Sequence, residues 1–328
     1  MNLFRMPGTW WTLILGVCAL FLPAFVKVPY FMHLIILALI WVVMAQGQNL
    51  IQGFTGYDSI AQAGFMGVGA YVSTLLSTKL GWPVWSTIWM APLFTGFIAI
   101  FVGYPSLRVK GHYFAIVTLA YNMVIFTVLL TYSSLTGGEA GIPNVPRPSE
   151  LRFGETVVSF EGRSNIYYYY LVLAMAALSV LLSALILYSR VGRVLLSIRQ
   201  NETLSEAVGV ETWRYKLFAF IVSASLAGLA GGLYAHYIGF LNPEPFGVDQ
   251  SLNAILAVIL GGSGTLTGPI VGSFAVVFLP EYLRIADSYR LITYGLILVI
   301  ATIFLPHGLV PMVSRALAAL AKKWGLRA

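Results

Sequence analysis

Amide side chains gather in one stretch of an otherwise apolar chain. Gln46, Gln48, Asn49, Gln52 and Gln62 follow one another closely, and Gln48 and Gln52 share a helical face because they are four residues apart. Such amides can line a path for a polar solute, or they can hydrogen-bond neighbouring helices to one another. The sequence leaves both interpretations open. They apply equally to five later polar residues: Thr118, Tyr121, Asn122, His236 and Asn253.

Patterns that carry catalysis or bind cofactors do not occur in the sequence. It lacks the G-x-x-x-x-G-K-[ST] loop that cradles nucleotide phosphates, the H-E-x-x-H metal pattern and the G-x-S-x-G nucleophile pattern. The histidines stand singly, and each is expected to be hydrogen-bonded or interfacial: His33, His112, His236 and His307. The single cysteine, Cys18, is expected to be a packing residue. We therefore expect no enzyme activity, no cofactor and no metal site.

Ionisable groups are scarce inside the apolar runs, which bears on how transport could be driven. Coupling to protons or sodium usually leaves carboxylates or basic groups at membrane depth. Asp58 is the sole candidate, and it stands at the end of an apolar run, where capping a helix or lining a mouth is the favoured role. The scarcity of such groups argues against a secondary carrier driven by an ion gradient, and we keep such a carrier as the alternative function.

The composition decides which elements position these residues. Of 328 residues, 59% are hydrophobic and 9% are charged, against about 25% charged in a soluble domain. The apolar runs are long and do not alternate, which predicts an all-α, polytopic membrane protein of about 8–10 transmembrane helices in a single domain, residues 1–328. The runs are Trp10–Val26, Tyr30–Leu50, Ser59–Ser77, Trp85–Val102, Tyr113–Leu130, Ile166–Leu187, Leu217–Tyr237, Ser251–Pro280 and Leu291–Leu305.

The basic residues predict the orientation of these runs. The chain carries a net charge of +7 but no basic cluster, so we expect no nucleic-acid partner. With both termini in the cytoplasm, the positive-inside rule places twelve of the nineteen basic residues inside, with residues 190–216 as an inner loop and 131–165 as an outer loop. The twelve are Arg5, Arg108, Lys110, Arg190, Arg193, Arg199, Arg214, Lys216, Arg315, Lys322, Lys323 and Arg327. The other seven are Lys27, Lys79, Arg147, Arg152, Arg163, Arg284 and Arg290.

Glycine interrupts the run at residues 251–280. Gly261 to Pro269 divides it into flanks too short for a full span, which predicts a broken helix pair near the translocation path and gives eight or ten crossings. Gly53-Phe-Thr-Gly56 is a similar segment in the first half, and shared glycine bias or an internal repeat could explain the likeness. Small residues at every fourth position, such as Ala224, Gly228 and Gly232, predict close contact between helices.

The inner loop is the most informative soluble segment. Thr203-Leu-Ser-Glu206 fits a capping box, and Gly209 is suited to end a very short helix. Such a helix presents a small apolar tip of Leu204, Ala207 and Val208, which suits docking into a groove on a cytosolic partner. A plain connection between helices is the other interpretation.

At this loop the sequence resembles the inner-membrane permease subunits of branched-chain amino acid ABC transporters, of the LivM type. The resemblance covers most of the chain and rests on Asn49–Tyr71, Gly111–Ala120, Ser134–Gly138, Gly141-Ile142, Glu206-Ala207-x-Gly209, Tyr215–Phe220, Ala227–His236 and the glycine loop from Gly261. It implies an importer of branched-chain or related amino acids in the bacterial inner membrane. It also implies a second permease subunit of the LivH type, two cytosolic ATP-binding subunits that hydrolyse ATP, and a periplasmic substrate-binding protein.

The resemblance makes the Glu206 region the coupling helix, which here comprises Thr203, Leu204, Glu206, Ala207, Val208 and Gly209. Three departures put the substrate in doubt: Gln62 stands where many relatives have histidine, Met123 where an acid is common, and Asp58 where an apolar or amide residue is usual. Relatives also move urea, short amides or aromatic acids. The candidate path residues remain Gln46, Gln48, Asn49, Gln52, Asp58, Gln62, Asn122 and Asn253.

Overall fold

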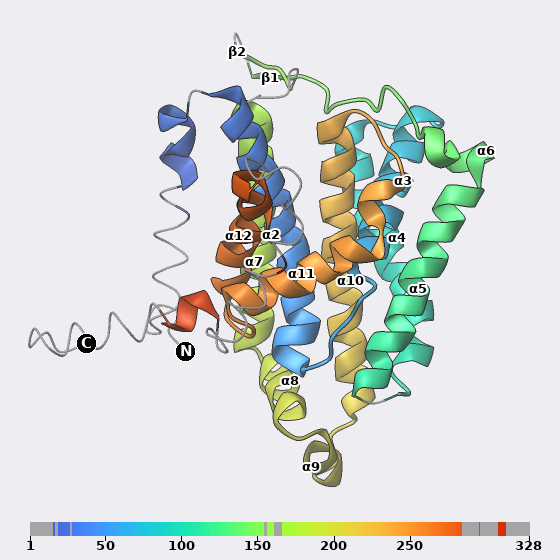
Figure 1. Ribbon diagram of the computed structural model, residues 1–328, viewed down its shortest axis with the longest axis vertical. Coiled ribbons are helices and arrows are strands. Elements are labelled where there is room, and N and C mark those ends of the chain that lie inside the picture. The colour runs from blue at the N-terminus through green and yellow to red at the C-terminus, as the bar shows by residue number, and fades with distance from the viewer. Residues whose placement is uncertain are drawn as a thin grey trace, which may run out of the picture.

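Apolar helices make up most of the described chain (Figure 1). The structure is a computed structural model that describes residues 16, 19–26, 28–109, 111–153, 156–160, 166–283, 295 and 308–312. Within these residues, five helices are long and apolar enough to cross a membrane: α2 (Pro29–Thr55), α4 (Val84–Ser106), α5 (His112–Thr131), α7 (Ile166–Tyr188) and α10 (Thr212–Ile238). They confirm the predicted helical membrane class. Eight of the seventeen residues of the predicted run Trp10–Val26 lie outside the described residues, and so does the predicted run Leu291–Leu305 except for Gly295.

Shorter elements connect the long helices. They are α3 (Gln62–Thr78), α6 (Ser133–Thr136), η2 (Gly138–Ala140), β1 (Leu151–Phe153), β2 (Thr156–Val158), α8 (Arg190–Gln200), α9 (Glu202–Ala207), η3 (Glu244–Phe246), α11 (Val248–Gly261) and α12 (Gly268–Tyr282). Among them, α3, α11 and α12 pack within the bundle (Figure 1). The antiparallel hairpin of β1 and β2 lies at one end of the bundle, and α9 projects from the other (Figure 1). We call these the hairpin end and the α9 end.

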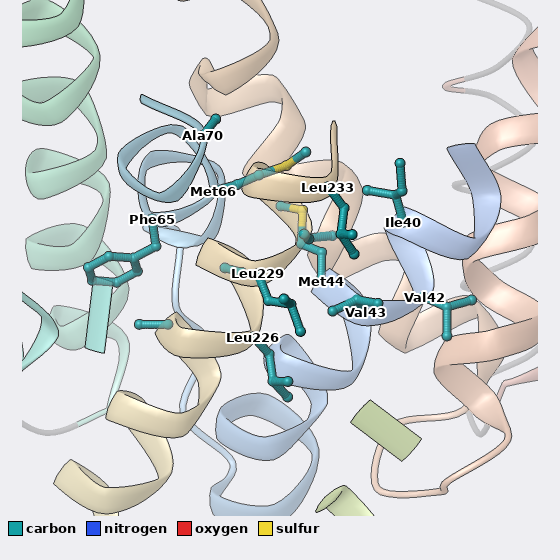
Figure 2. Packing of buried hydrophobic residues seen from close by; sticks show 14 of the residues in the cluster. Ile40, Val42, Val43, Met44, Phe65, Met66, Ala70, Leu226, Leu229 and Leu233 are labelled. Carbon is teal, nitrogen blue, oxygen red and sulfur yellow. The ribbon is translucent and has the colours of Figure 1, made fainter. Parts of the chain in front are cut away.

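Helix α10 lies at the centre of the bundle, packed against α2, α3 and α4 (Figure 1). Helices α2 and α10 are mostly buried, while α5 and α7 expose most of their apolar surface. A helix that is apolar on all sides is stable either in a protein core or against lipid. Helices α2 and α10 are of the first kind, and α5 and α7 are of the second. Figure 2 shows the central packing, in which α2, α3 and α10 contribute Ile40, Val43, Met44, Phe65, Met66, Ala70, Leu226, Leu229 and Leu233.

Glycines allow α3 and α10 to approach at backbone contact. A Cβ atom on Gly69 would lie 2.2 Å from the carbonyl oxygen of Gly228, and one on Gly231 would lie 1.9 Å from that of Met66. Both distances are far inside van der Waals contact, so only glycine fits at either position. The close helix contact predicted from the small residues is confirmed, and it serves packing within the chain.

The predicted break between residues 251 and 280 is present. Helices α11 and α12 are separated by residues 262–267, and a Cβ on Gly272 would lie 1.7 Å from the carbonyl oxygen of Ala257, so the two helices pack backbone to backbone. The turn between them contacts the α9 end of α2, and α12 returns to the hairpin end, where Tyr30 donates a hydrogen bond to Glu281. The prediction of two short helices is thereby confirmed.

The hairpin end is closed by the segment after α5. Ile142 and Leu241 exchange backbone hydrogen bonds, and the amide of Val145 donates to the carbonyl of Gly239 at 3.0 Å. His236 of α10 holds the same segment because its Nδ1 lies 2.6 Å from the carbonyl oxygen of Pro146. A carbonyl can only accept, so Nδ1 carries the proton and Nε2 is left to accept from Ser73, at 2.8 Å.

Candidate functional site

The α9 end is built from two short helices with different surfaces. Helix α8 begins at Ser189, whose hydroxyl oxygen accepts a hydrogen bond from the amide of Gly192 at 3.3 Å. It buries Leu195 and Ile198 against the bundle and leaves Arg193 exposed. An amphipathic helix of this kind packs its apolar face on the end of the bundle and positions the helix that follows.

Helix α9 begins earlier than the sequence predicted. Asn201 is the N-cap, with its side-chain oxygen accepting from the amide of Leu204 at 2.9 Å, so the predicted capping box from Thr203 to Glu206 is wrong. Asparagine caps a helix as well as threonine does, and Asn201 has the extended backbone that a cap requires. Glu206 is instead drawn to α10, where it accepts from the hydroxyl of Thr212 at 2.9 Å.

The end of α9 follows the prediction. Gly209 has φ of 88°, its amide donates to the carbonyl of Glu206 at 3.0 Å, and the amide of Val210 donates to that of Ser205 at 3.0 Å. This is a Schellman motif, which needs a left-handed residue that glycine provides at least cost. The helix therefore ends at a fixed position after only six residues.

The tip of α9 is apolar and exposed, as the sequence predicted. Leu204 is 62% exposed and Val208 is 73% exposed, and Ala207 is exposed between them. Leu204 and Val208 are four residues apart, so they share one face of α9. Within α9 only Ser205 is buried. Helix α9 projects from the bundle (Figure 1), so the exposed Leu204, Ala207 and Val208 are free to contact another molecule.

A buried charge cluster attaches α9 to the bundle, and sequence reasoning missed it. The Nζ of Lys216 in α10 lies 2.6 Å from Oε1 of Glu202, and their side chains are only 2% and 14% exposed. Tyr57, in the segment between α2 and α3, donates its hydroxyl to Glu202 and also lies 3.2 Å from Lys216 Nζ. Burial and the neighbouring Glu202 carboxylate raise the pKa of Tyr57, so its hydroxyl stays protonated and able to donate.

The amides of α2 are buried and bind the backbone of distant segments. Gln46 donates to the carbonyl of Leu266 at 2.8 Å, and Gln48 donates to that of Ser59 at 3.2 Å. Asn49 donates to the carbonyl of Thr265 and accepts from the amide of Gly264, both at 2.9 Å. The two glycine-rich segments therefore meet at the α9 end, bridged by Asn49.

A second bridge between these segments comes from α8. The guanidinium of Arg199 donates to the carbonyl oxygen of Gly53, and a Cβ on Gly264 would lie 2.4 Å from its Nη1. Arg199 thus occupies the space where the two glycine segments approach each other. The sequence signal was the pair of glycine clusters, but it gave no indication of which cation lies between them.

Gln62 and Asn122 hold the beginning of α3. Gln62 donates to the carbonyl of Ser223 at 3.2 Å, and Asn122 Oδ1 accepts from the amide of Gly64 at 2.5 Å. The hydroxyl of Ser251, from α11, accepts from the amide of Ala63 at 2.8 Å. The backbone N–H groups in the first turn of a helix have no acceptor within that helix. At the start of α3, side chains of α5 and α11 supply the acceptors.

Some buried polar atoms in this region have no hydrogen-bond partner. They are Gln46 Oε1, Gln48 Oε1 and Asn122 Nδ2. An unpaired polar atom in a buried position costs about 1–3 kcal/mol, and contact with water or a ligand is one way in which that cost is relieved. All three belong to residues that the sequence offered as candidates for the path.

Of the other candidate path residues, Asp58 and Asn253 are more open, whereas Gln52 is buried. Asp58 keeps part of its surface in solvent, but the surrounding chain partly desolvates its carboxyl and so raises its pKa, opposed by the nearby His112 and by a hydrogen bond with Gln52. It does not cap α3, because the N-cap is Ala61 and no side chain caps it there. Gln52 accepts from Gln48 at 3.3 Å, and the half-buried Asn253 donates to Gln250 at 3.3 Å.

Two of the histidines make side-chain hydrogen bonds within the bundle. His33 Nδ1 lies 2.8 Å from the hydroxyl of Tyr237, and His236 is hydrogen-bonded at the hairpin end. His307 and Cys18 lie outside the described residues. Among the residues that the structure does describe, no three histidine, cysteine, aspartate or glutamate side chains are grouped so as to hold a metal ion.

The basic residues that the structure describes are divided between the two ends in the grouping that the charge pattern predicted. Lys79, which donates to the carbonyl of Ser134, and Arg147, which follows Pro146, lie at the hairpin end. After α4, in α8 and in the first turns of α10, at the α9 end, lie Arg108, Arg190, Arg193, Arg199, Arg214 and Lys216. The remaining residues used for orientation fall outside the described side chains: Arg5, Lys27, Lys110, Arg152, Arg163, Arg284, Arg290, Arg315, Lys322, Lys323 and Arg327.

Comparison with known proteins gives this geometry a family context. Residues 30–302 match the family described as "Branched-chain amino acid transport system / permease component". The chain is 30% identical over 292 residues, 84% of its length and 69% of the relative's, to the high-affinity branched-chain amino acid transport system permease protein LivM of Escherichia coli K12. It is 26% identical over 291 residues to LivH of the same strain, covering 82% of this chain and 90% of LivH. No solved structure matches.

Proposed function

The chain belongs to the branched-chain amino acid transport permease family, and from that premise we propose that it is the LivM-type permease subunit of an ATP-binding cassette importer for branched-chain or related amino acids. It is the permease and not the ATPase. The match to both LivM and LivH supports a pair of related permease subunits in one complex, with a LivH-type chain as the second. We assign residues 1–328 to one transmembrane domain.

The observation that carries the proposal is the exposed apolar tip of α9. We assign Thr203, Leu204, Glu206, Ala207, Val208 and Gly209 to the coupling helix, which docks into a groove on a cytosolic ATP-binding subunit. An amphipathic helix that inserts exposed apolar residues into a groove is a recurrent mode of recognition. Two such subunits would bind and hydrolyse ATP, and a periplasmic binding protein would deliver the amino acid to the hairpin end.

Orientation in the bacterial inner membrane follows from the same assignment. The α9 end is cytoplasmic, the hairpin end is periplasmic, and both termini lie in the cytoplasm. The basic residues at the α9 end support this orientation. A cysteine at position 193 should react with a membrane-impermeant maleimide only in inside-out vesicles, and one at position 150 only in right-side-out vesicles, in a Cys18→Ala background. The opposite pattern would reverse the orientation.

The path is proposed to run beside the start of α3. Gln46, Gln48, Asn49, Gln52, Asp58, Gln62, Asn122 and Asn253 would line it or hold the helices that do. The unpaired atoms of Gln46, Gln48 and Asn122 support a contact with water or the amino acid there. ATP binding would close the ATP-binding subunits, move the docked α9, and switch the permease pair between outward-open and inward-open states.

The decisive test is docking of the α9 tip. We would express the chain with its predicted partners, purify the complex, and measure retention of the ATP-binding subunits and ATP-driven uptake in proteoliposomes. Leu204→Asp should lower both by at least about tenfold, because it places a charge at the centre of the contact. The matched control is Leu135→Asp at the hairpin end, a leucine 50% exposed, which should retain the subunits. Unchanged uptake by Leu204→Asp would overturn the assignment.

The ligand of the cognate binding protein tests the substrate class. We expect leucine, isoleucine or valine to bind the isolated binding protein and to compete for uptake by the reconstituted complex. A binding protein that retains urea, a short amide or an aromatic acid instead would keep the importer assignment and replace the substrate.

A further inference from the structure

Lys216 is a buried cation whose contacts all lead to two other segments. Its ammonium contacts the Glu202 carboxylate at 2.6 Å and the Tyr57 hydroxyl at 3.2 Å, and it lies 4.6 Å from the centre of the Tyr57 ring. A buried ion pair is a weak source of stability, because apolar residues of similar size often do as well. What the pair provides is a fixed geometry between the elements it joins.

Those elements are the coupling helix and the segment that leads into α3. Glu202 is the first residue of α9, Lys216 lies in the second turn of α10, and Tyr57 follows the end of α2. Helix α9 buries only Ser205 of its own residues. Its position relative to the bundle is therefore set by its direct continuation from α8, by the hydrogen bond between Ser205 and Ser197, and by the polar contacts of Glu202 and Glu206, and not by apolar packing.

Tyr57 in turn connects to the candidate path through two sets of contacts. Its ring packs edge-to-face on Phe114, Phe114 on Phe220, and Phe220 on Phe65 of α3, with centroids 5.3 to 5.9 Å apart. After Tyr57, the carbonyl of Ser59 accepts from Gln48 and the amide of Ile60 donates to Thr118 at 3.0 Å. A displacement of Tyr57 therefore changes the contacts of α2 amides and of the start of α3.

We infer that Glu202, Lys216 and Tyr57 are positioning residues that transmit movement of α9 to the 56–61 segment and thence to α3, so that ATP use and opening of the path stay linked. The inference rests on the proposed function and adds to it the residues that couple its two parts. If the inference is right, changing these residues alters the number of amino acid molecules transported per ATP hydrolysed and leaves the docking of α9 unaffected.

The experiment uses the reconstituted complex with its binding protein and compares Glu202→Gln, Lys216→Met and Tyr57→Phe with the parent chain. Uptake and ATP hydrolysis are measured in the same proteoliposomes. A cysteine at position 208, cross-linked to an ATP-binding subunit, reports docking. The matched control is Glu211→Gln, which removes a nearby carboxylate from an exposed ion pair with Arg214 at 2.5 Å.

We expect Glu202→Gln and Lys216→Met to keep the cross-link and basal ATP hydrolysis while uptake per ATP falls about tenfold, which is the usual size of a coupling between sites. Tyr57→Phe keeps the ring contact with Phe114 and loses only the hydroxyl, so its loss should be smaller. The exchanged pair, Glu202→Lys with Lys216→Glu, should restore at least half of the parent ratio. Glu211→Gln should behave as the parent does.

Three results would overturn the inference. The first is a parental ratio of uptake to ATP hydrolysis in the single variants. The second is a loss of the cross-link that parallels the loss of uptake, which would show that the cluster only holds the structure together. If the Lys216→Met complex fails to assemble, the results for Tyr57→Phe and Glu202→Gln decide the question. The third is failure of the exchanged pair to restore coupling. A parent complex that lacks ATP-driven uptake would instead refute the proposed function.

Discussion

Single glycines set the spacing of the central helices, and Gly231 is the most constrained of them on α10. Alanine at this position would place Cβ 1.9 Å from the Met66 carbonyl oxygen, a backbone atom that cannot move alone. We expect Gly231→Ala to destabilise the protein by about 1–3 kcal/mol through overpacking. Thermal unfolding in detergent would measure the loss.

The adjacent glycine provides the control for this prediction. A Cβ on Gly232 would lie 3.2 Å from Ala91 Cβ and 3.6 Å from Ser73, contacts that small side-chain shifts relieve. Alanine also gains about 1 kcal/mol of helix propensity over glycine. Gly232→Ala should therefore unfold close to the parent temperature, and equal effects of the two substitutions would contradict the backbone contact described for Gly231.

Asp58 gives a pH-dependent contribution to stability whose sign follows from its surroundings. Burial raises the pKa of its carboxyl above 3.8, so the folded chain binds this proton more tightly than the unfolded chain does. Stability from this group is therefore present at low pH and falls as the pH rises through the raised pKa. Asp58→Asn removes the charge and with it the free-energy cost of partly desolvating a charged carboxylate.

The melting temperature of Asp58→Asn should exceed that of the parent by more at pH 7 than at pH 4. Glu150→Gln, at an exposed position on the hairpin end, controls for the loss of a carboxylate as such. A difference that shrinks or reverses between pH 4 and pH 7 would show that His112 and Gln52 outweigh burial.

Among the elements, the long helices were predictable and the caps were not. Runs of apolar residues are a local property, and six of them correspond to α2, α3, α4, α5, α7 and α10. The break before Gly268 was likewise predictable, because several glycines lie close together in that stretch of the sequence. The start of α9 was misjudged because Asn201 and Thr203 are both good caps, and the choice depends on Glu206 bonding to Thr212 of another helix.

Helix α9 itself depends on Gly209. Its left-handed φ of 88° costs an alanine about 1–2 kcal/mol, and no atom lies within 4 Å of a Cβ built there, so the effect of Gly209→Ala is purely one of backbone. We expect faster hydrogen exchange across residues 201–210 with an unchanged global melting temperature. Gly209→Asn should exchange more slowly than Gly209→Ala, since asparagine tolerates this conformation. Equal protection in all three chains would argue against the Schellman motif.

At the scale of the whole molecule, Asn49 joins the two halves of the chain. Its bonds to Gly264 and Thr265 hold the turn between α11 and α12 against α2. Asn49→Leu leaves the half-buried amide of Gly264 and the half-buried carbonyl of Thr265 without this partner, at a cost of about 1 kcal/mol for each group. We expect a lower melting temperature in detergent and earlier proteolysis within residues 262–267.

The matched control removes a buried polar atom that has no partner. Ser183 Oγ in α7 is buried and unpaired, so Ser183→Ala should leave stability unchanged or raise it. If Asn49→Leu is as stable as Ser183→Ala, the contact between the two glycine segments does not hold the halves together.

The candidate site was predictable in its parts and not in its connections. The apolar tip of α9 and the amides of α2 are visible in sequence because each lies within one short segment. The pairing of Lys216 with Glu202 and Tyr57 is not, since Tyr57 lies 159 residues from Lys216 and no spacing rule relates them. Such contacts are decided only when the helices pack.

The bond from Asn49 to Thr265 spans 216 residues, and this separation matters during synthesis. At about 5–20 residues per second, the ribosome needs roughly 10–40 s after making Asn49 before its partner exists. Throughout that interval, α2 carries Gln46 and Asn49 in the membrane with neither of their final partners, Leu266 and Thr265, yet made. Biogenesis of this protein therefore requires that the insertion machinery or the lipid–water boundary shelter α2 until the last helices arrive.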